Sequence, residues 1–145
     1  MSDFLERAAH LPVTEFGYPG PLRERLNAAI LAGLKTSTTS LLADYDHPGE
    51  ELPRAGQHYR LIDSDERAIA IVETTEVRTA RLAEVDLQHA LDEGEGLTSV
   101  EEWREAHERF WTGAEHTAST GGRATLDDDT LVVLERFRVV ELPSS

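Results

Sequence analysis

The sequence predicts a single α+β domain, and three observations support this. The predicted order is a helix, several strands, two helices and a final strand. Helices and strands that do not alternate favour an α+β arrangement over a parallel α/β sheet. The length of 145 residues fits one domain, and no internal repeat or linker divides it. We therefore expect a small, partly closed antiparallel sheet with helices at its ends.

The first part of the chain predicts two helices and then a run of hydroxyl side chains. Residues 1–15 contain a short amphipathic stretch, which predicts a peripheral N-terminal helix. Pro21 suits the first position of a second helix, and Gly33 suits the left-handed residue that ends it. Residues 36–40 are five consecutive Ser or Thr. Such residues form helices poorly but can bond the local backbone or a ligand.

The middle of the chain predicts strands because apolar and β-branched residues lie between polar turns. The expected order is a polar loop over residues 44–56, a strand over 57–62, a hairpin turn over 63–66, a return strand over 68–72 and a continuation or a further strand over 74–80.

The last part of the chain predicts two helices, a loop and a strand. Asp86 caps a short helix that ends at the glycines of residues 93–96, and residues 98–101 form a capping box for a helix to about Trp111. Residues 113–129 are polar and glycine-rich, which leaves a long loop, a lid or disorder open. Residues 131–134 and 137–140 make the final strand.

The composition excludes several classes of protein. The chain has no cysteine, so disulfides and thiolate zinc sites are excluded. It has no apolar run long enough to span a membrane and no secretion signal at its start, so a cytoplasmic protein without a membrane partner is expected. The net charge of −14 disfavours extended RNA as the main partner and favours a small substrate.

Lys35 stands out because it is the only lysine among fourteen basic residues. Lysine differs from arginine in that its ammonium can lose a proton when it is desolvated. A Thr nucleophile activated by this lysine is chemically plausible, and Thr38 lies three residues further on. The alternative is a lysine that caps helix carbonyls beside a polar turn.

Acidic and aromatic residues later in the chain are further candidates. Glu93 and Glu95 flank a glycine in a turn where carboxylates can point into a site, although a polar turn between helices is the alternative. Trp103 and His107 share one side of the last helix, where either a core face or a stacking role against a base is possible. The six histidines show no paired spacing, so we expect neither a metal nor a cofactor.

Several segments resemble the ASCH domain family in the right order, across roughly residues 16–142. They are residues 16–17, 32–40, 52–56, 68–77, 89–96, 103–107 and 135–140, which include Gly33-Leu-Lys35-Thr-Ser-Thr38 and His89-Ala-Leu-Asp-Glu93. The sequence departs from the small members of the family at Thr39-Ser40, where they have Ile-Arg, and in its Glu-Gly-Glu-Gly turn. It is therefore identified as a member of a different, larger subgroup.

The resemblance implies a PUA-like β-barrel with flanking helices. The family was proposed to bind RNA, some small members hydrolyse N4-acetylcytidine with a Lys, a Thr and a Glu, and another member has been described as a ribonuclease. The matching positions here are Lys35, Thr38 and Glu93. The residues that we expect around the substrate are Thr36, Thr39, Glu95, Trp103 and His107.

The leading hypothesis is an amidohydrolase for an N4-acylated cytidine-type nucleoside. In this hypothesis a neutral Lys35 takes the proton of Thr38, and Glu93 protonates the departing amine. An RNA-binding module and a metal-independent ribonuclease are the alternatives, and the sequence leaves the oligomeric state open.

Overall fold

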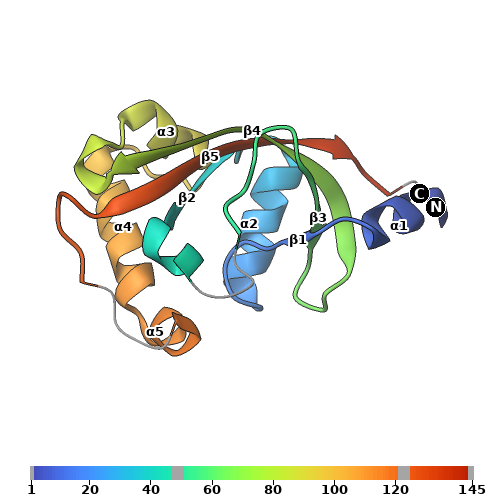
Figure 1. Cartoon of the computed structure of the whole chain (residues 1–145), viewed down its shortest axis with the longest axis horizontal. Coiled ribbons are helices and arrows are strands. Elements are labelled where there is room, and N and C mark those ends of the chain that lie inside the picture. The colour runs from blue at the N-terminus through green and yellow to red at the C-terminus, as the bar shows by residue number, and fades with distance from the viewer. Residues whose placement is uncertain (1, 47–50, 121–124, 144–145) are drawn as a thin grey trace.

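The computed structural model describes residues 2–46, 51–120 and 125–143, and it has a curved five-stranded sheet flanked by helices (Figure 1). The loop predicted over 44–56 and the segment 113–129 each include residues outside these ranges. The elements in chain order are α1 (Ser2–Ala9), β1 (Val13–Thr14), α2 (Pro21–Leu31), β2 (Ser37–Leu41), η1 (Leu42–Asp46), β3 (His58–Ile62), β4 (Ala68–Arg81), η2 (Leu82–Glu84), α3 (Leu87–Asp92), α4 (Val100–Thr112), α5 (Ala114–Thr120) and β5 (Leu131–Glu141).

The sheet has the strand order β1-β3-β4-β5-β2. All pairings are antiparallel except that of β1 with β3. The predicted α+β class with flanking helices is therefore confirmed. The sheet is open and mixed instead of purely antiparallel, because β1 and β2 form separate edges and β1 runs parallel to its neighbour.

Three apolar clusters make the core. The cluster beside α2 contains Phe16, Leu26, Ile30, Leu61, Ala70, Val72 and Phe137. The cluster under α3 and α4 contains Leu41, Leu82, Val85, Ala90, Trp103, Trp111, Val132 and Leu134. A small third cluster joins Phe4 and Ala8 of α1 to Ile71 of β4.

Three local features differ from the expectation or refine it. Residues 114–120 form α5 where a loop was predicted, because the stretch before the glycines holds good helix formers such as Ala114 and Glu115. The hydroxyl run becomes strand β2 because β5, from the far end of the chain, supplies its hydrogen bonds. Residues 68–81 form one continuous strand with irregularities in its pairing to β5.

The cap of α4 lies one residue later than predicted. Ser99, not Thr98, is the N-cap, and its hydroxyl accepts a hydrogen bond from the Glu102 amide. Thr98 is still used, since its hydroxyl donates to the Glu102 carboxylate at 2.8 Å. Adjacent hydroxyls can each satisfy the first turn, so the sequence pattern alone did not separate them.

No helix in the described part of the chain is both long enough and apolar enough to cross a membrane.

Candidate active site

Lys35 lies in the short connection between α2 and β2, and its side chain is only 2% exposed. The backbone amides of Leu34 and Lys35 both donate to the Ala29 carbonyl, which closes the end of the helix. The Lys35 Nζ donates to the carbonyl of Ser37 at 2.8 Å and to that of Glu93 at 3.3 Å. It thus points inward, where its partners are oxygen acceptors.

Two carboxylates complete the surroundings of this ammonium. Nζ lies 3.5 Å from Glu93 Oε1 and 3.9 Å from Glu95 Oε2. It also lies 5.8 Å from the centre of the Phe16 ring, within the range of a cation–π contact. Such surroundings suit a charged donor. The two carbonyls that Nζ contacts belong to Ser37 and Glu93, which lie outside α2 and α3, and a role of Lys35 in a site stays a prediction.

Glu93 follows α3, and hydrogen-bond donors hold it in the interior at 1% exposure. Its Oε2 accepts from the Thr39 hydroxyl at 2.7 Å and from the Trp103 indole at 2.8 Å. The Thr39 hydroxyl has one proton and gives it to Glu93, so it accepts from His89 Nε2 at 2.8 Å. Glu93 is therefore fixed by residues from β2, α3 and α4.

These contacts determine the charge of Glu93. Burial alone would raise the pKa of this carboxyl, but the Lys35 ammonium and the hydrogen bonds from His107 and His89 outweigh it and hold the pKa well below its usual value. Glu93 is consequently an ionised carboxylate near neutral pH. It is a poor proton donor, which goes against the acid role that the sequence suggested for it.

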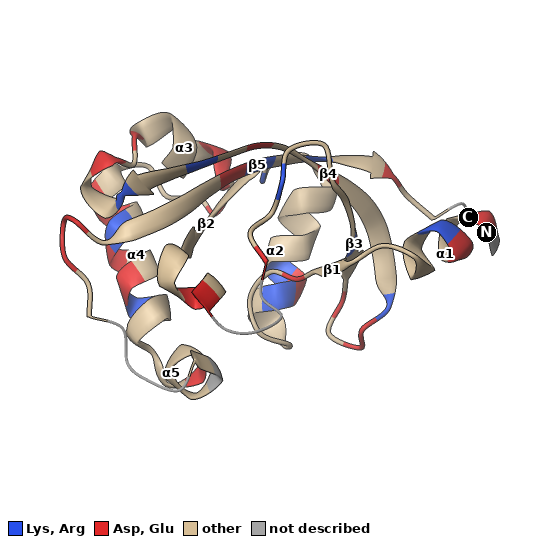
Figure 2. Cartoon of the chain, viewed as in Figure 1, with Lys and Arg blue, Asp and Glu red and all other residues tan. Residues whose placement is uncertain are grey.

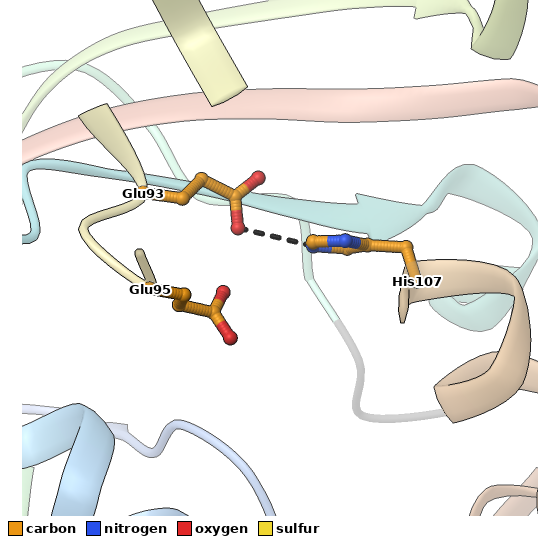
Figure 3. A group of neighbouring side chains, drawn as sticks. All are labelled: Glu93, Glu95 and His107. Carbon is orange, nitrogen blue, oxygen red and sulfur yellow. Dashed lines mark hydrogen bonds and ion pairs between the residues drawn. The ribbon is translucent and has the colours of Figure 1, made fainter. Parts of the chain in front are cut away.

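His107 of α4 faces the same carboxylate (Figure 3). Its ring stacks on Trp103 with the centroids 4.3 Å apart, and its Nδ1 donates to the Trp103 carbonyl at 2.8 Å. Its Nε2 lies 3.0 Å from Glu93 Oε1. Burial opposes the charged ring, but the hydrogen bond to Glu93 outweighs it and raises the pKa of His107. Both ring nitrogens then donate, as in an imidazolium.

Glu95 enters the site because the chain turns tightly at Gly94. Gly94 has φ of +66°, and a Cβ there would overlap the carbonyl oxygen of Leu34. The glycine therefore lets the turn approach the backbone before Lys35, whereas the sequence suggested an approach to a ligand. Burial raises the pKa of Glu95 and the charge of Glu93 adds to the effect, although Lys35 opposes it.

Glu93, Glu95 and His107 also form the kind of group that can hold a metal, since one ligand atom of each lies within 4.8 Å of the others. Sequence spacing did not reveal this group, because its members come from two separate segments. The ammonium of Lys35 sits within ion-pair distance of both carboxylates. A cation bound there would have to displace or repel it, so these residues fit a metal poorly.

A cavity of about 530 Å³ opens beside this cluster. Thr38 of β2 lines it, and the Thr38 hydroxyl has no hydrogen-bond partner among the described residues. The aromatic rings of Phe16, Tyr18, Phe110 and Trp111 line it as well. Tyr18 stacks on Phe110 at 5.6 Å and bonds the ring of His116 at 3.0 Å.

Most of the predicted site residues meet at this cavity. Those that line it are Lys35, Thr38, Thr39, Glu93, Glu95 and His107. Thr36 does not line it and faces the Asp92 carbonyl instead. Trp103 is 0% exposed and lies beneath the site, where its indole N–H donates to Glu93 and its ring stacks on that of His107.

Sequence reasoning missed two groups at the cavity. Glu135 of β5 lines it and is the cross-strand partner of Thr38. Tyr18 and His116 form the aromatic end with Phe110. In the sequence, Glu135 could have been noticed as a carboxylate within a mostly apolar strand. His116 could have been noticed as a histidine that follows an aromatic stretch.

The fold and the cavity together describe an α+β domain with a buried ionic pair beside an open cavity, and comparison with known proteins gives its family. The chain belongs to the ASCH domain family, whose model matches residues 13–141. A solved structure from Enterococcus faecalis is 30% identical, has a TM-score of 0.80 and covers 97% of this chain and 85% of its own. An ASCH domain from Lactobacillus crispatus is 28% identical, has a TM-score of 0.76 and covers 97% of this chain and 86% of its own. None of the curated proteins matches the chain.

Proposed function

We propose that the cavity hydrolyses the amide of an N4-acylated cytidine-type nucleoside. One observation carries the proposal: Glu93, which lies more than fifty residues from Lys35 and Thr38 in the sequence, lines the same cavity as they do, and the Thr38 hydroxyl in that cavity has no hydrogen-bond partner among the described residues. A hydroxyl nucleophile, a cation and a carboxylate can together carry out acyl transfer.

The contacts suggest how the roles are divided. Thr38 is the nucleophile, because its hydroxyl faces the cavity without a partner among the described residues. Lys35 supplies positive charge for the carbonyl oxygen as it becomes an oxyanion, instead of acting as the neutral base expected from the sequence. Glu93 holds Lys35 and His107 in place.

A different carboxyl then protonates the departing amine. Glu95 is the better donor of the two glutamates, because burial raises its pKa while that of Glu93 is lowered. It lines the cavity and its side chain is 20% exposed, so it can reach a substrate.

The size and lining of the cavity support a small planar substrate. A volume of about 530 Å³ lies in the range of small-molecule sites. The rings of Tyr18 and Phe110 at one end suit stacking against a nucleobase. The net charge of −14 and the basic segments scattered among acidic ones (Figure 2) give less support to extended RNA.

The experiment is to incubate the purified protein with N4-acetylcytidine and follow cytidine release by chromatography. We expect release that falls by about a thousandfold or more in Thr38→Ala, because a nucleophile is removed. Thr79→Ala is the matched control, since Thr79 is an exposed threonine on β4.

Full activity in Thr38→Ala would reject the assignment of Thr38 as the nucleophile. No release by the wild-type protein, with either N4-acetylcytidine or longer acyl chains, would reject the proposed function. RNA cleavage without metal that Lys35→Ala abolishes would then favour the ribonuclease alternative.

A further inference from the structure

Glu135 is a cavity carboxyl that the roles above do not use. It lies on β5 directly opposite Thr38 of β2, and both residues line the cavity. In an antiparallel pair, directly opposite side chains lie on the same face with Cβ atoms about 4.5–5.5 Å apart. The Glu135 side chain is long enough to bring its carboxylate to the Thr38 hydroxyl.

The Glu135 carboxyl is oriented by one hydrogen bond and left open on its other side. The hydroxyl of Thr74, which is 0% exposed, donates to Glu135 Oε2 at 2.8 Å. The other oxygen, Oε1, has no hydrogen-bond partner among the described residues. A held carboxyl with one free oxygen in a cavity is suited to accept a proton.

The charges around Glu135 differ from those around Glu93. Burial raises the pKa of Glu135, against the lowering effects of Thr74 and Lys35. Tyr59 of β3 is a further titratable group that interacts with Glu135, and Glu93, Glu95 and His107 line the same cavity. A carboxylate whose proton affinity is increased in this way is a stronger base.

We propose that Glu135 is the catalytic base that takes the proton of Thr38. The inference rests on the proposed amide hydrolysis and adds a residue to it. In the first step the Thr38 Oγ–H proton passes to Glu135 while Oγ bonds to the acyl carbon. The C–N bond then breaks, the amine nitrogen takes a proton from Glu95, and an acyl ester on Thr38 remains.

The second step releases the acid and restores the site. A water molecule attacks the ester carbon, its proton passes to the Glu95 carboxylate, and the C–O bond to Thr38 breaks. The departing Thr38 oxygen takes back the proton held by Glu135. Both glutamates and the threonine end in their starting states, and one amide and one water have become one amine and one acid.

The test compares Glu135→Gln with the wild-type protein in the N4-acetylcytidine assay. We expect kcat to fall by about 10²- to 10⁴-fold with KM nearly unchanged, and the acid limb of the pH–rate profile to disappear. Glu76→Gln is the matched control, because Glu76 is an exposed glutamate on β4. An unchanged rate and acid limb in Glu135→Gln, with Thr38→Ala inactive, would overturn this inference and leave the proposed function standing.

Two further variants separate a catalytic role from a structural one. Thr74→Val removes the hydrogen bond that lowers the pKa of Glu135, so the acid limb should move to higher pH. Glu135→Asp keeps the carboxyl but shortens it, so the rate should fall while the acid limb remains. An acid limb that stays in place in Thr74→Val would count against Glu135 as its source. Absence of any deacylation by the wild-type protein would reject the function and this role together.

Discussion

Two of the glutamates that line the cavity, Glu93 and Glu135, have surroundings that shift their pKa values in opposite directions. Glu93 follows α3 and is held by Thr39, Trp103 and His107, beside the ammonium of Lys35. Glu135 lies on β5, and Thr74 is its one hydrogen-bond donor in the part of the chain that the structure describes. Burial raises the pKa of both, but only at Glu93 do donors and a cation reverse the effect.

The difference shows that burial alone does not decide what a carboxyl can do. A carboxylate surrounded by donors stays ionised and holds its neighbours in place, whereas one with few donors can exchange a proton. The same cavity therefore has a fixed carboxylate on the helix side and a titratable one on the strand side. Four changes test this comparison.

Removal of the Lys35 charge should have the largest effect. In Lys35→Met, Glu93 and Glu95 lose the cation between them, and breaking a buried ion pair on one side costs about 3–5 kcal/mol. Urea unfolding at pH 7 measures the loss. Arg67→Met is the control, since Arg67 is 73% exposed and its pairs contribute about 0–1 kcal/mol. A loss no larger than that of the control would show that Lys35 does not stabilise the helix side.

A Cβ at position 94, in the turn after α3, should also destabilise the helix side of the cavity, but through a steric clash instead of a lost charge. Gly94→Ala places the new atom against the Leu34 backbone at a positive φ, so we expect a loss above about 2 kcal/mol in free energy of unfolding. Gly96→Ala has φ of +81° but open space around the new atom, so only about 1 kcal/mol is expected. Equal losses in the two variants would mean that the close approach at Gly94 is unimportant.

Trp103→Phe removes one donor from Glu93 and should cost about 1–3 kcal/mol. It should also raise the pKa of Glu93, because one of the bonds that favour the carboxylate is lost. Trp111→Phe is the matched control, since Trp111 is also buried but its indole has no hydrogen-bond partner among the described residues. Chemical denaturation of both variants gives the difference, and a larger loss in Trp111→Phe would contradict the role of the indole.

The smallest effects should appear in the pH dependence of stability, with opposite signs for the two glutamates. The pKa of Glu93 is lowered on folding, so its contribution is present above the unfolded pKa of about 4.3 and is lost as the pH falls below it. The pKa of Glu135 is raised, so its contribution is present below about pH 4.3 and is lost as the pH rises through the folded pKa.

Unfolding of Glu93→Gln and Glu135→Gln between pH 3 and pH 8 measures both contributions. Relative to the wild-type protein, Glu93→Gln should become less stable as the pH rises, and Glu135→Gln should become more stable. Curves with the same slope would show that the two carboxyls share one environment and would remove the basis of the comparison.

The sequence predicted helices better than strands for a physical reason. The spacing of apolar residues in α2 and α4 is set within each segment, so those helices could be predicted from local information. Strand β2 is a run of hydroxyl residues with no alternation of apolar side chains. It is a strand because β5 pairs with it, and no local pattern contains that information.

In the site too, some residues could be predicted from local sequence and others depend on distant parts of the chain. Lys35, Thr38 and Glu93 could be selected from short motifs, and all three line the cavity. The relation of Glu135 to Thr38 depends on the register between two strands from opposite ends of the chain. The charges of Glu93 and Glu95 depend on how closely a turn packs, which residue type alone does not specify.

The solitary lysine gives the protein a built-in reporter. Amine-reactive reagents can modify the α-amino group and Lys35 but no other side chain amine, and Lys35 is 2% exposed. Because Lys35 lines the cavity, its labelling reports how accessible the cavity and the interior around α2 and β2 are to a small reagent, and mass spectrometry of the intact chain would count each event. The rate of that single modification therefore measures how often Lys35 becomes accessible at the place where the chemistry of the protein is proposed.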